Sequence, residues 1–532
     1  MNGRALGALA LVAGVAALYA PALGFEFLAY DDSVYVTRNP HLADGLTAAS
    51  VRFAFANTHA GNWHPLTWLS HALDVELFGL APAGHHATNV ALHAGNAALL
   101  FAALAALTGR RGRSFAVAAL WALHPLQLES VAWVAERKNL LSTGFGWLAL
   151  LAYAGYARRG GAGRLAAVAA LLAASLLAKP MLVTLPFLLL LLDVWPLART
   201  ASWRRLVLEK LPLFALAAAV SALVFVTQAR AGAMEPAQQL SLLARLAWLP
   251  VAYAGYLAHA LWPVELAVLY PHPLLLEGAA LSGVRVALAL GLLLALSALA
   301  GAAFRRGRRA AWIGWLWFLG TLVPVSGIVQ VGWQGLADRY AYVPLAGLLV
   351  ALVWSAADAL ERVRPERQRV LAGAAATALA CALLVLAARA QLGPWRSSEA
   401  LFERALAVTG PNPVMHNELG VVLAEDRRLG PARVHFERAA ALAPRWSAPH
   451  QNLGALLRTL GRPAEALPHL EASLALAPDH VPAHVTLANA LLDLGRRSEA
   501  HAHLDRALAL DPGDPRALLL RARFEQLERT RR

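Results

Sequence analysis

Apolar stretches long enough to cross a lipid bilayer recur along this chain from residue 5 to about residue 389 and then stop. Crossing the hydrocarbon core takes about 20 consecutive apolar residues in a helix. Because a bilayer offers no water to backbone N–H and C=O groups, such segments form helices or closed barrels. With 58% apolar and 15% charged residues in a chain of 532, the sequence predicts an all-α protein, a polytopic bundle of membrane helices followed by a different C-terminal domain.

Positive charge is concentrated in short loops between the apolar stretches. The formal net charge is +14, of which residues 395–532 carry +2. Short basic loops between apolar spans mark the cytoplasmic side of a membrane. This placement accounts for the basic composition, so we expect no nucleic-acid partner. The loops are 110–113, 158–164, 199–210, 305–309 and 362–369.

Taking these loops as cytoplasmic predicts eleven crossings, with the N-terminus inside and the C-terminus outside. The segment after Arg4 resembles a signal peptide but lacks a small-residue cleavage site, so we interpret it as the first membrane helix. Residues 247–262 are interpreted as a re-entrant or interfacial element, because another crossing would put the loop 305–309 outside. The expected spans are 5–24, 87–107, 115–128, 139–157, 165–178, 181–197, 211–228, 283–303, 310–326, 339–360 and 370–389.

A 34-residue repeat replaces the apolar stretches after residue 390. The pattern typical of tetratricopeptide repeats (TPRs) occurs three times, and its first copy comprises Leu419, Gly420, Leu423, Ala432, Phe436, Ala439 and Pro444. Small residues let paired helices approach, large ones fill the gap, and proline ends the second helix. We therefore expect a membrane domain at 1–390 and a repeat domain at 391–532 that binds partners in a groove. Its predicted parts are a half repeat at 396–411, repeats at 412–445, 446–479 and 480–513, and a capping helix at 514–532.

Two adjacent carboxylates, Asp31 and Asp32, follow the first apolar stretch and open a long outer loop, 25–86. At the boundary of water and lipid a carboxylate can stay ionised and still face a substrate carried in lipid. One aspartate could act as general base on an acceptor hydroxyl while its neighbour orients it or shifts its pKa. The alternative is a turn or cap that closes the helix. The sequence leaves either aspartate as the base.

Histidine and asparagine residues mark one face of the second apolar helix. His86, Asn89 and His93 fall at i, i+3 and i+7, and polar groups in a membrane helix usually face a cavity or a partner helix. Metal binding is one interpretation, but no carboxylate has a matching spacing, so hydrogen bonding across helices is favoured. The single cysteine, Cys381, lies in an apolar stretch, which excludes disulfides and cysteine-based metal sites.

A second outer segment, 124–139, carries charge against the positive-inside bias. It contains Arg137 and Lys138 behind Glu129 and Glu136. Charge kept on the outer side suggests an anionic ligand such as a lipid phosphate, which arginine can bind with two hydrogen bonds. Pairing with the two glutamates alone is an equal alternative.

Two more cations stand on the predicted outer side. Lys179 precedes Pro180 at a break between two short spans, and Arg339 follows Asp338 where another span begins. Arg339 could pair with Asp338 or bind a phosphate at the start of its helix. The chain has no P-loop, zinc-protease or nucleophile-elbow motif.

Together these motifs resemble those of the bacterial relatives of the transmembrane and TPR-containing protein O-mannosyltransferases. The resemblance extends over nearly the whole chain, including the order of membrane part and repeats. The motifs are Tyr-Asp-Asp at 30–32, Trp-His-Pro-Leu-Thr-Trp-Leu-Ser-His at 63–71, and the segments 78–93, 124–138, 178–181 and 338–344.

The resemblance implies a glycosyltransferase bundle of the GT-C type in a bacterial inner membrane, with its active site at the first outer loop. Such enzymes transfer a sugar, mannose in the named family, from a polyprenyl phosphate to an acceptor outside the cytoplasm. Asp31 or Asp32 would then be the catalytic base. Candidates for the donor's phosphate and lipid are Arg137, Lys138, Lys179, Arg339 and Tyr342. Candidates for supporting the cavity are His64, His86, Asn89, His93, His124, Glu129 and Glu136.

We therefore expect a polyprenyl-phosphate-dependent glycosyltransferase whose repeats hold a protein or glycan acceptor. Arginine and lysine would stabilise the charge that develops on the leaving phosphate. No cofactor is required, and no residue pattern indicates a divalent metal. Two other classes remain open. A non-enzymatic membrane scaffold would not need outer carboxylates and cations, and a transporter of lipid-linked sugars would favour mid-span charges and inverted repeats.

Overall fold

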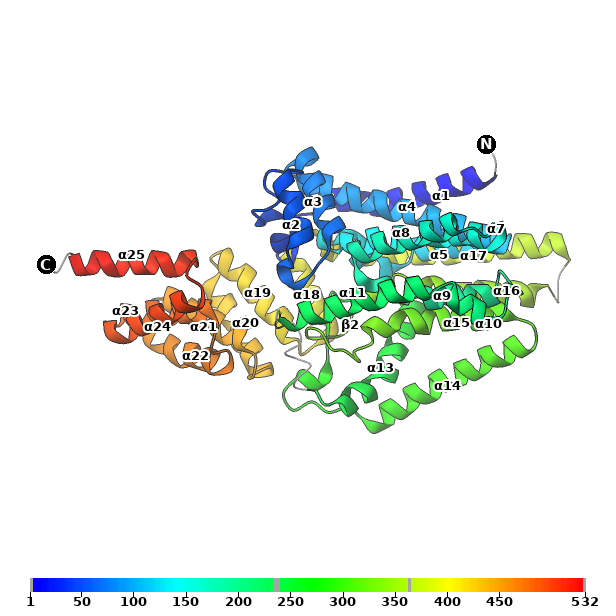
Figure 1. Cartoon of the computed structure of the whole chain (residues 1–532). Coiled ribbons are helices and arrows are strands. Elements are labelled where there is room, and N and C mark those ends of the chain that lie inside the picture. Colours follow the sequence, from blue (N-terminus) through cyan, green and yellow to red (C-terminus); the bar gives the residue numbers. More distant parts are fainter. Residues whose placement is uncertain (1–2, 231, 233–239, 362–364, 530–532) are drawn as a thin grey trace. The chain divides into compact units, whose positions relative to one another are not determined.

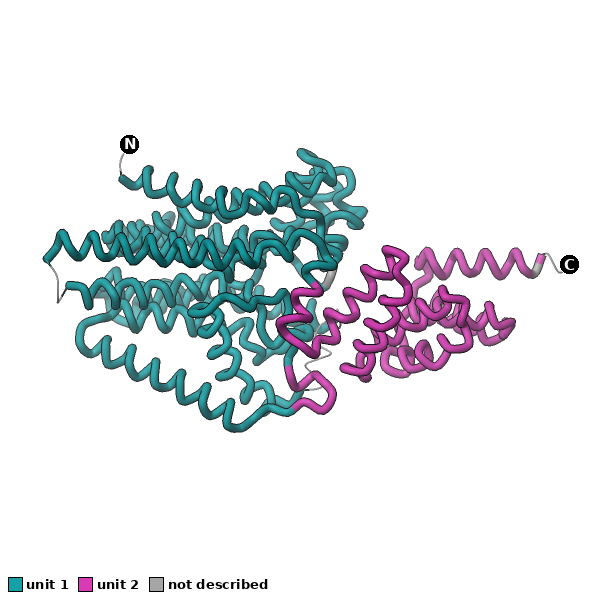
Figure 2. The backbone as a smooth tube through the Cα atoms, turned by 180° about the vertical axis from the view of Figure 1, so that it is seen from behind, with its two compact units in different colours: residues 1–272, 280–401 teal, residues 273–279, 402–532 magenta. Residues whose placement is uncertain are grey.

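The structure, a computed structural model, describes residues 3–230, 232, 240–361 and 365–529, which are predominantly helical (Figure 1). A short sheet pairs β1 (Tyr270–Pro271) antiparallel with β2 (Gln334–Leu336). The chain divides into two compact units, which Figure 2 colours separately. Unit 1 comprises residues 1–272 and 280–401, and unit 2 comprises residues 273–279 and 402–532. The predicted all-α class is confirmed.

Six helical segments in the described part of unit 1 are long and apolar enough to cross a membrane. A seventh candidate is a bent pair, α5 (Arg111–Ala122) followed by η4 (Pro125–Gln127) and α6 (Leu128–Ala132), with a 60° change of direction. The six are α1 (Gly3–Tyr19) with η1 (Ala20–Gly24), α4 (Pro82–Thr108), η5 (Val134–Glu136) with α7 (Arg137–Arg159), α11 (Leu211–Arg230), α14 (Gly283–Arg305), and α17 (Glu366–Leu392) with η10 (Gly393–Arg396).

Four further apolar helices are shorter than a bilayer requires. Every one of the eleven predicted spans coincides with a long, bent or short apolar segment, while the number of crossings stays a prediction. Helix α13 (Leu242–Leu261), which contains Pro250, is not among the six long candidates. The four are α8 (Ala162–Ala178), η6 (Pro180–Thr184) with α9 (Leu185–Val194), α15 (Arg309–Leu322) with η8 (Val323–Val325), and α16 (Pro344–Leu360).

Short helices connect the apolar segments of unit 1. The predicted outer loop, 25–86, contains several of them before α4 begins at Pro82. A capping box between Thr47 and Ser50 stabilises the N-terminus of α2. These short elements are η2 (Ser33–Thr37), α2 (Ala48–Ala56), η3 (His59–Gly61), α3 (Pro65–Phe78), α10 (Trp203–Leu208) and η9 (Asp338–Ala341).

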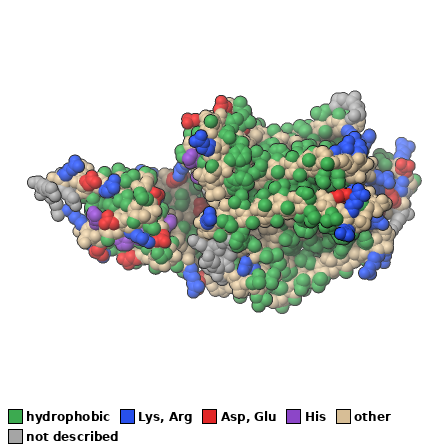
Figure 3. Space-filling view, viewed as in Figure 1, with side chains coloured by type: hydrophobic (Ala, Val, Ile, Leu, Met, Phe, Trp, Pro, Cys, Tyr) green, Lys and Arg blue, Asp and Glu red, His purple; other side chains and the backbone are tan. Residues whose placement is uncertain are grey.

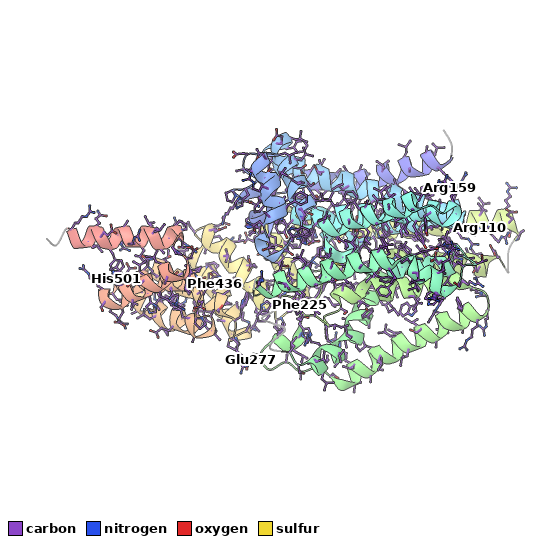
Figure 4. All side chains as sticks on the ribbon, viewed as in Figure 1. Arg110, Arg159, Phe225, Glu277, Phe436 and His501 are labelled. Atoms are coloured by element: carbon purple, nitrogen blue, oxygen red, sulfur yellow. The ribbon has the colours of Figure 1, made fainter. Side chains whose placement is uncertain are left out.

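The surface of unit 1 has the character of a membrane protein. The apolar window of α17 buries none of its residues and that of α14 almost none. Figure 3 shows hydrophobic side chains over much of the visible face, with Lys and Arg gathered at one end. Arg110 and Arg159 lie at that end (Figure 4), and α2 and α3 lie at the other (Figure 1). The basic loops and residues 25–81 thus occupy opposite ends of the bundle.

Glycines allow two helices of unit 1 to pack closely. A Cβ atom added to Gly314 of α15 would lie 2.5 Å from the carbonyl oxygen of Gly347 in α16, and one added to Gly347 would lie 2.6 Å from Trp317. Small residues at such crossings are typical of helix association in membranes.

Unit 2 is built mainly of paired antiparallel helices. Small residues sit where the paired helices touch, since a Cβ added to Gly420 would lie 2.6 Å from Phe436, and one added to Gly454 would lie 2.5 Å from Leu470. The helices are α18 (Ser398–Thr409), α19 (Pro413–Glu425), α20 (Leu429–Leu442), α21 (Ser447–Thr459), α22 (Pro463–Leu476), α23 (Val481–Asp493), α24 (Arg497–Leu510) and α25 (Pro515–Arg529), and a short η7 (Pro273–Leu275) joins the unit.

Candidate functional site

The two adjacent aspartates after η1 have different environments. Asp31 is exposed and has a φ of 65°, in the left-handed region that aspartate adopts more readily than most residues. Asp32 is fully buried. Its Oδ2 accepts the backbone N–H of Leu28 at 2.8 Å and its Oδ1 accepts that of Ala135 at 2.8 Å. Asp32 therefore ties the loop to η5, while Asp31 is turned outward.

Burial acts strongly on Asp32. It raises the pKa of this carboxyl to about 7, although the N–H groups of Leu28 and Ala135 lower the pKa. Because both oxygens already accept hydrogen bonds from the backbone, Asp32 is poorly placed to receive a proton from a substrate. Asp31 is close enough to Lys138 to interact with it electrostatically.

Three cations from different parts of the chain converge on one carboxylate, Glu136. Its oxygens lie 3.2 Å from Nζ of Lys138, 2.8 Å from Nζ of Lys179 and 3.5 Å from Nε of Arg339. Arg339 also pairs with Glu129, whose Oε2 accepts the Arg339 backbone N–H at 2.7 Å. We call these five residues the cation cluster. It contains three positive and two negative groups.

Exposure differs within the cation cluster. The side chains of Lys138, Lys179 and Arg339 keep 9%, 10% and 11% of their surface exposed, whereas Glu129 and Glu136 each keep 2%. The carboxylates thus lie beneath the cations. An anion arriving from outside would meet positive charge first.

Aromatic rings connect the cation cluster with the loop that carries Asp31. Tyr30 stacks on Trp133 with ring centroids 5.1 Å apart, and the Trp133 indole N–H donates to the carbonyl oxygen of Tyr30 at 2.8 Å. Arg339 lies 5.4 Å and Lys138 5.6 Å from the centroid of the Trp133 ring. Lys138 also lies 4.3 Å from the centroid of the Tyr35 ring. These contacts are within range of cation–π attraction and fix the cations in place.

A helix break places Lys179 in the cation cluster. The chain leaves helical geometry between α8 and η6, at Lys179 itself. Thr67 Oγ1 donates to the carbonyl oxygen of Ala178 at 2.9 Å, and Ser142 Oγ donates to that of Lys179 at 2.9 Å. The backbone carbonyls freed by the break are therefore satisfied by side chains, as a break inside a membrane protein requires.

Arg137, the neighbour of Lys138, lies in a separate group that we call the Arg137 network. Its guanidinium is fully buried and contacts Asp74 Oδ2 at 2.5 Å and Asn89 Oδ1 at 2.9 Å. It also donates to the carbonyl oxygens of Ser70 at 3.2 Å and His85 at 2.8 Å. Each of its three nitrogens has a protein acceptor. The structure does not bring Arg137, expected at the donor's phosphate, into the cation cluster.

Tyr342 and His93, two other expected site residues, lie in a further buried group. The Tyr342 hydroxyl is 2.7 Å from Nδ1 of His93 and accepts from Asn96 at 3.3 Å. Nε2 of His93 is 3.0 Å from the carbonyl oxygen of Ala122. This arrangement is the hydrogen bonding across helices favoured from the sequence. The Tyr342 hydroxyl therefore points to His93 and Asn96, while its backbone N–H donates to the carbonyl oxygen of Arg339 at 3.4 Å.

The remaining expected residues brace local structure. The Asn89 amide donates to the carbonyl oxygens of Val131 and Trp133 at 3.3 and 3.0 Å. Nε2 of His86 lies 3.4 Å from the carbonyl oxygen of Glu26. His124 accepts the backbone N–H of Leu126 at 3.2 Å through Nδ1, and its Nε2 lies 3.0 Å from the carbonyl oxygen of Ala260.

His64 is the expected cavity residue that lies beside the cation cluster. It is buried at the start of α3 and close enough to Lys138, Lys179 and Glu136 to interact with them electrostatically. Burial, followed by the two lysines, lowers its pKa to about 3, so the imidazole is neutral at pH 7. In the described residues its Nδ1 has no hydrogen-bond partner.

Asp74, Trp133 and Asp338 have roles that were not assigned from the sequence. Asp74 neutralises Arg137, and Trp133 joins the cation cluster to Tyr30. Asp338 does not pair with Arg339, because its oxygens lie 3.0 Å from His259 Nδ1 and from the Tyr270 hydroxyl. The sequence feature that could have indicated a role for Trp133 is its position between the charged residues Glu129 and Glu136 in an otherwise apolar segment. Nothing in the spacing pointed to Asp74.

In the part of the chain that the structure describes, no group of three or more His, Cys, Asp or Glu residues could hold a metal ion.

Comparison with known proteins identifies relatives of parts of the chain. The profile described as "Tetratricopeptide repeat" matches residues 457–524. Protein O-mannosyl-transferase TMTC1 of Mus musculus is 34% identical over 160 residues, 28% of this chain and 17% of the mouse protein. Its Homo sapiens counterpart is 31% identical over 160 residues, and Tmtc1 of Drosophila melanogaster is 35% identical over 134. The alignments thus span about a sixth of the length of these curated relatives.

Solved structures with similarity include TPR proteins. YrrB, described as a TPR protein with an unusual peptide-binding site, is 22% identical with a TM-score of 0.23, over 32% of this chain and 89% of that one. The APC/C hetero-tetramer Cut9-Hcn1 gives 17% identity and a TM-score of 0.25, over 93% of this chain and 99% of that one. The profile match supports the TPR part of the chain, and the local similarity to O-mannosyltransferases suggests a glycosyltransferase.

Proposed function

We propose that the chain is an integral membrane glycosyltransferase that moves a sugar, mannose by analogy with the named relatives, from a polyprenyl phosphate to a hydroxyl of a protein acceptor. The observation that carries the proposal is the convergence of Lys138, Lys179 and Arg339 above Glu136, beside the exposed Asp31. The bundle would be of the GT-C type in a bacterial inner membrane, with eleven crossings. The cation cluster and the TPRs would face the non-cytoplasmic side.

The charge of the cation cluster suits a phosphate diester. Counted with all five side chains ionised, three cations and two carboxylates leave one positive charge in excess, opposite in sign to the single negative charge of a sugar linked to a lipid phosphate. When the sugar leaves, the lipid monophosphate gains further negative charge, since the second pKa of such a group is about 6. Preorganised cations that face this developing charge lower the barrier to transfer.

Asp31 is the proposed general base. The acceptor oxygen attacks the anomeric carbon, the bond from that carbon to the phosphate oxygen breaks, and its electron pair stays with the lipid phosphate. The hydroxyl proton passes to the Asp31 carboxylate. Asp32, with both oxygens held by backbone N–H groups, fixes the turn that presents Asp31 and is a positioning residue. This distinction refines the equal candidacy of the two aspartates in the sequence.

The proposal is tested by sugar transfer in proteoliposomes that contain the full chain, a polyprenyl-phosphate mannose and a Ser/Thr-rich peptide. Asp31→Asn should lower the turnover number by about 1,000-fold, within the range for loss of a general base, and leave the melting temperature unchanged. Asp44→Asn, an exposed aspartate of the same loop, is the matched control and should keep wild-type transfer. Full activity in a correctly folded Asp31→Asn protein would remove Asp31 as the base.

The acceptor is tested in cells. Glycopeptides from the cell envelope would be compared by mass spectrometry between cells that produce the wild-type chain and cells that produce Asp31→Asn. Sugar-modified Ser or Thr sites should disappear in the variant although the protein is still inserted in the membrane. Identical glycopeptides in both strains would favour a non-enzymatic scaffold, because a scaffold needs the repeats and not the carboxylate.

A further inference from the structure

Each of the three repeats in unit 2 contains one pair of histidines. The first members, His416, His450 and His484, are 34 residues apart, and so are the second members, His435, His469 and His503. Each pair joins the two helices of one repeat. This repetition is independent of the proposed glycosyltransferase site.

The pairs do not share one geometry. In the first pair, Nδ1 of His416 lies 3.0 Å from Nδ1 of His435, and in the third pair Nδ1 of His484 lies 3.0 Å from Nδ1 of His503. The middle pair instead stacks its rings, with centroids 6.0 Å apart, and Nδ1 of His450 is buried without a hydrogen-bond partner in the described part of the chain. The middle pair is therefore an internal control.

The proton on His484 can be located from its surroundings. Its Nε2 lies 2.9 Å from the carbonyl oxygen of Pro478, which can only accept, so Nε2 carries the hydrogen. In the tautomer with hydrogen on Nε2, Nδ1 of His484 holds a lone pair, and it lies 3.0 Å from Nδ1 of His503. Metal-binding histidines almost always donate their other ring N–H to a carbonyl or carboxylate in this way.

Burial lowers the pKa of His416, His435 and His503. Burial, followed by His435 and Arg438, lowers the pKa of His416 to about 4. Burial and His484 lower the pKa of His503, while Glu499 and Glu471 act in the opposite direction. Neutral imidazole is the form that binds metals. The two glutamates also favour a cation near the third pair.

The distance between the two Nδ1 atoms of a pair indicates which coordination angle, and therefore which metal ions, the pair would suit. Two nitrogen ligands at about 2.0–2.1 Å from a metal and at a right angle lie about 2.8–3.0 Å apart, whereas a tetrahedral angle separates them by about 3.3–3.4 Å. The 3.0 Å distances match the right angle. Square-planar or tetragonal nitrogen sites are typical of Cu²⁺ and Ni²⁺.

We propose that the first and third histidine pairs each bind one Cu²⁺ or Ni²⁺ ion through their two Nδ1 atoms. The hydrogen shared by the two nitrogens moves to Nε2 of the second histidine, so both rings stay neutral and the metal takes its place. Since no group of three or more suitable side chains occurs among the described residues, water fills the remaining coordination positions. The alternative is that each pair shares only a proton.

The experiment titrates the full chain in detergent with Cu²⁺ and measures stoichiometry by calorimetry and nitrogen coordination by electron paramagnetic resonance. His416→Asn with His435→Asn should remove one ion relative to wild type, and so should His484→Asn with His503→Asn. The middle pair, His450→Asn with His469→Asn, is the matched control and should remove none. Exposed His501→Asn should also remove none.

The outcomes separate the two alternatives. Each variant is first shown to melt at the wild-type temperature without metal, and the single substitutions His435→Asn and His503→Asn replace any double variant that does not. Loss of one ion and its nitrogen signal for the first and third pairs supports the sites. Equal Cu²⁺ binding in all variants, or loss of an ion with the middle pair, overturns the proposal. Transfer activity does not enter this test, so its result is independent of the proposed function.

Discussion

Arg137 and Lys138 are adjacent at the start of α7, yet they belong to opposite kinds of charged group. The Arg137 network is closed, because a fully buried guanidinium finds an acceptor for every nitrogen, including Asp74 at 2.5 Å. The cation cluster is more open, because the three cations that share Glu136 keep 9%, 10% and 11% of their side-chain surface exposed. A fully compensated charged group such as the Arg137 network stabilises the fold, whereas a group with one cation in excess can bind an anionic ligand.

The largest effect is expected from opening the closed network. Arg137→Met should lower the free energy of unfolding by about 3–5 kcal/mol, because it leaves the Asp74 carboxylate buried without its partner. Thermal melting in detergent measures the loss. The double variant Arg137→Met with Asp74→Asn should recover part of it. If Arg137→Met melted like the wild type but lost donor binding, the Arg137 network and not the cation cluster would be the donor site.

Removing a cation from the cation cluster should affect catalysis more than folding, because in Arg339→Ala the buried Glu129 keeps its hydrogen bond from the backbone N–H of residue 339. We expect Arg339→Ala to lower kcat/KM for the lipid-linked sugar by about 100-fold, the usual cost of one electrostatic contact to a transition state. The KM for the acceptor peptide should not change. Exposed Arg285→Ala is the matched control. An equal loss in both arginine variants would contradict a specific role of the cation cluster.

Replacing the central carboxylate, Glu136, tests whether the cation cluster binds a phosphate. Glu136→Gln leaves three cations facing each other and should lower the free energy of unfolding by about 2 kcal/mol, less than Arg137→Met because the three cations are not fully buried. Added polyprenyl phosphate should restore the melting temperature of Glu136→Gln by more than it raises that of the wild type. Equal shifts in both proteins would mean that the lipid phosphate does not contact the cluster.

The smallest effect concerns pH. Burial lowers the pKa of Lys179, in the break between α8 and η6, to about 8, since Glu136 only partly offsets burial and the other two cations lower it further. As pH rises through 8, the lysine loses its charge and affinity for the donor should fall, by less than about tenfold. Lys179→Arg should remove this decline, because arginine keeps its charge. Donor titrations at pH 7 and 9 measure the difference.

Periodic patterns made the fold predictable from the sequence. Long apolar stretches predicted the membrane helices, and the 34-residue pattern predicted the repeats, because both follow from residues near each other in the chain. Lys179 and Arg339 could also be identified from local sequence, because each is a charged residue within a largely apolar part of the chain. Glu136 was considered only as a partner of Arg137 and Lys138, so its contacts with Lys179 and Arg339 were not predicted.

Long-range contacts could not be predicted in this way. The residue types around Asp31 and Asp32 do not distinguish the two, since one of the two backbone N–H groups that hold Asp32 belongs to Ala135, 103 residues away. Arg137 matched Lys138 in charge and position, and its partner Asp74 comes from another helix. Tyr342 stood in a motif with Arg339 but turns toward His93 and not toward the cluster.

The break at Lys179 also has a consequence for biosynthesis. Two earlier side chains satisfy the carbonyls at the break: Thr67 precedes Ala178 by 111 residues, and Ser142 precedes Lys179 by 37. A ribosome makes both side chains before the break itself, so Thr67 and Ser142 are already present in the chain when these two carbonyls are synthesised.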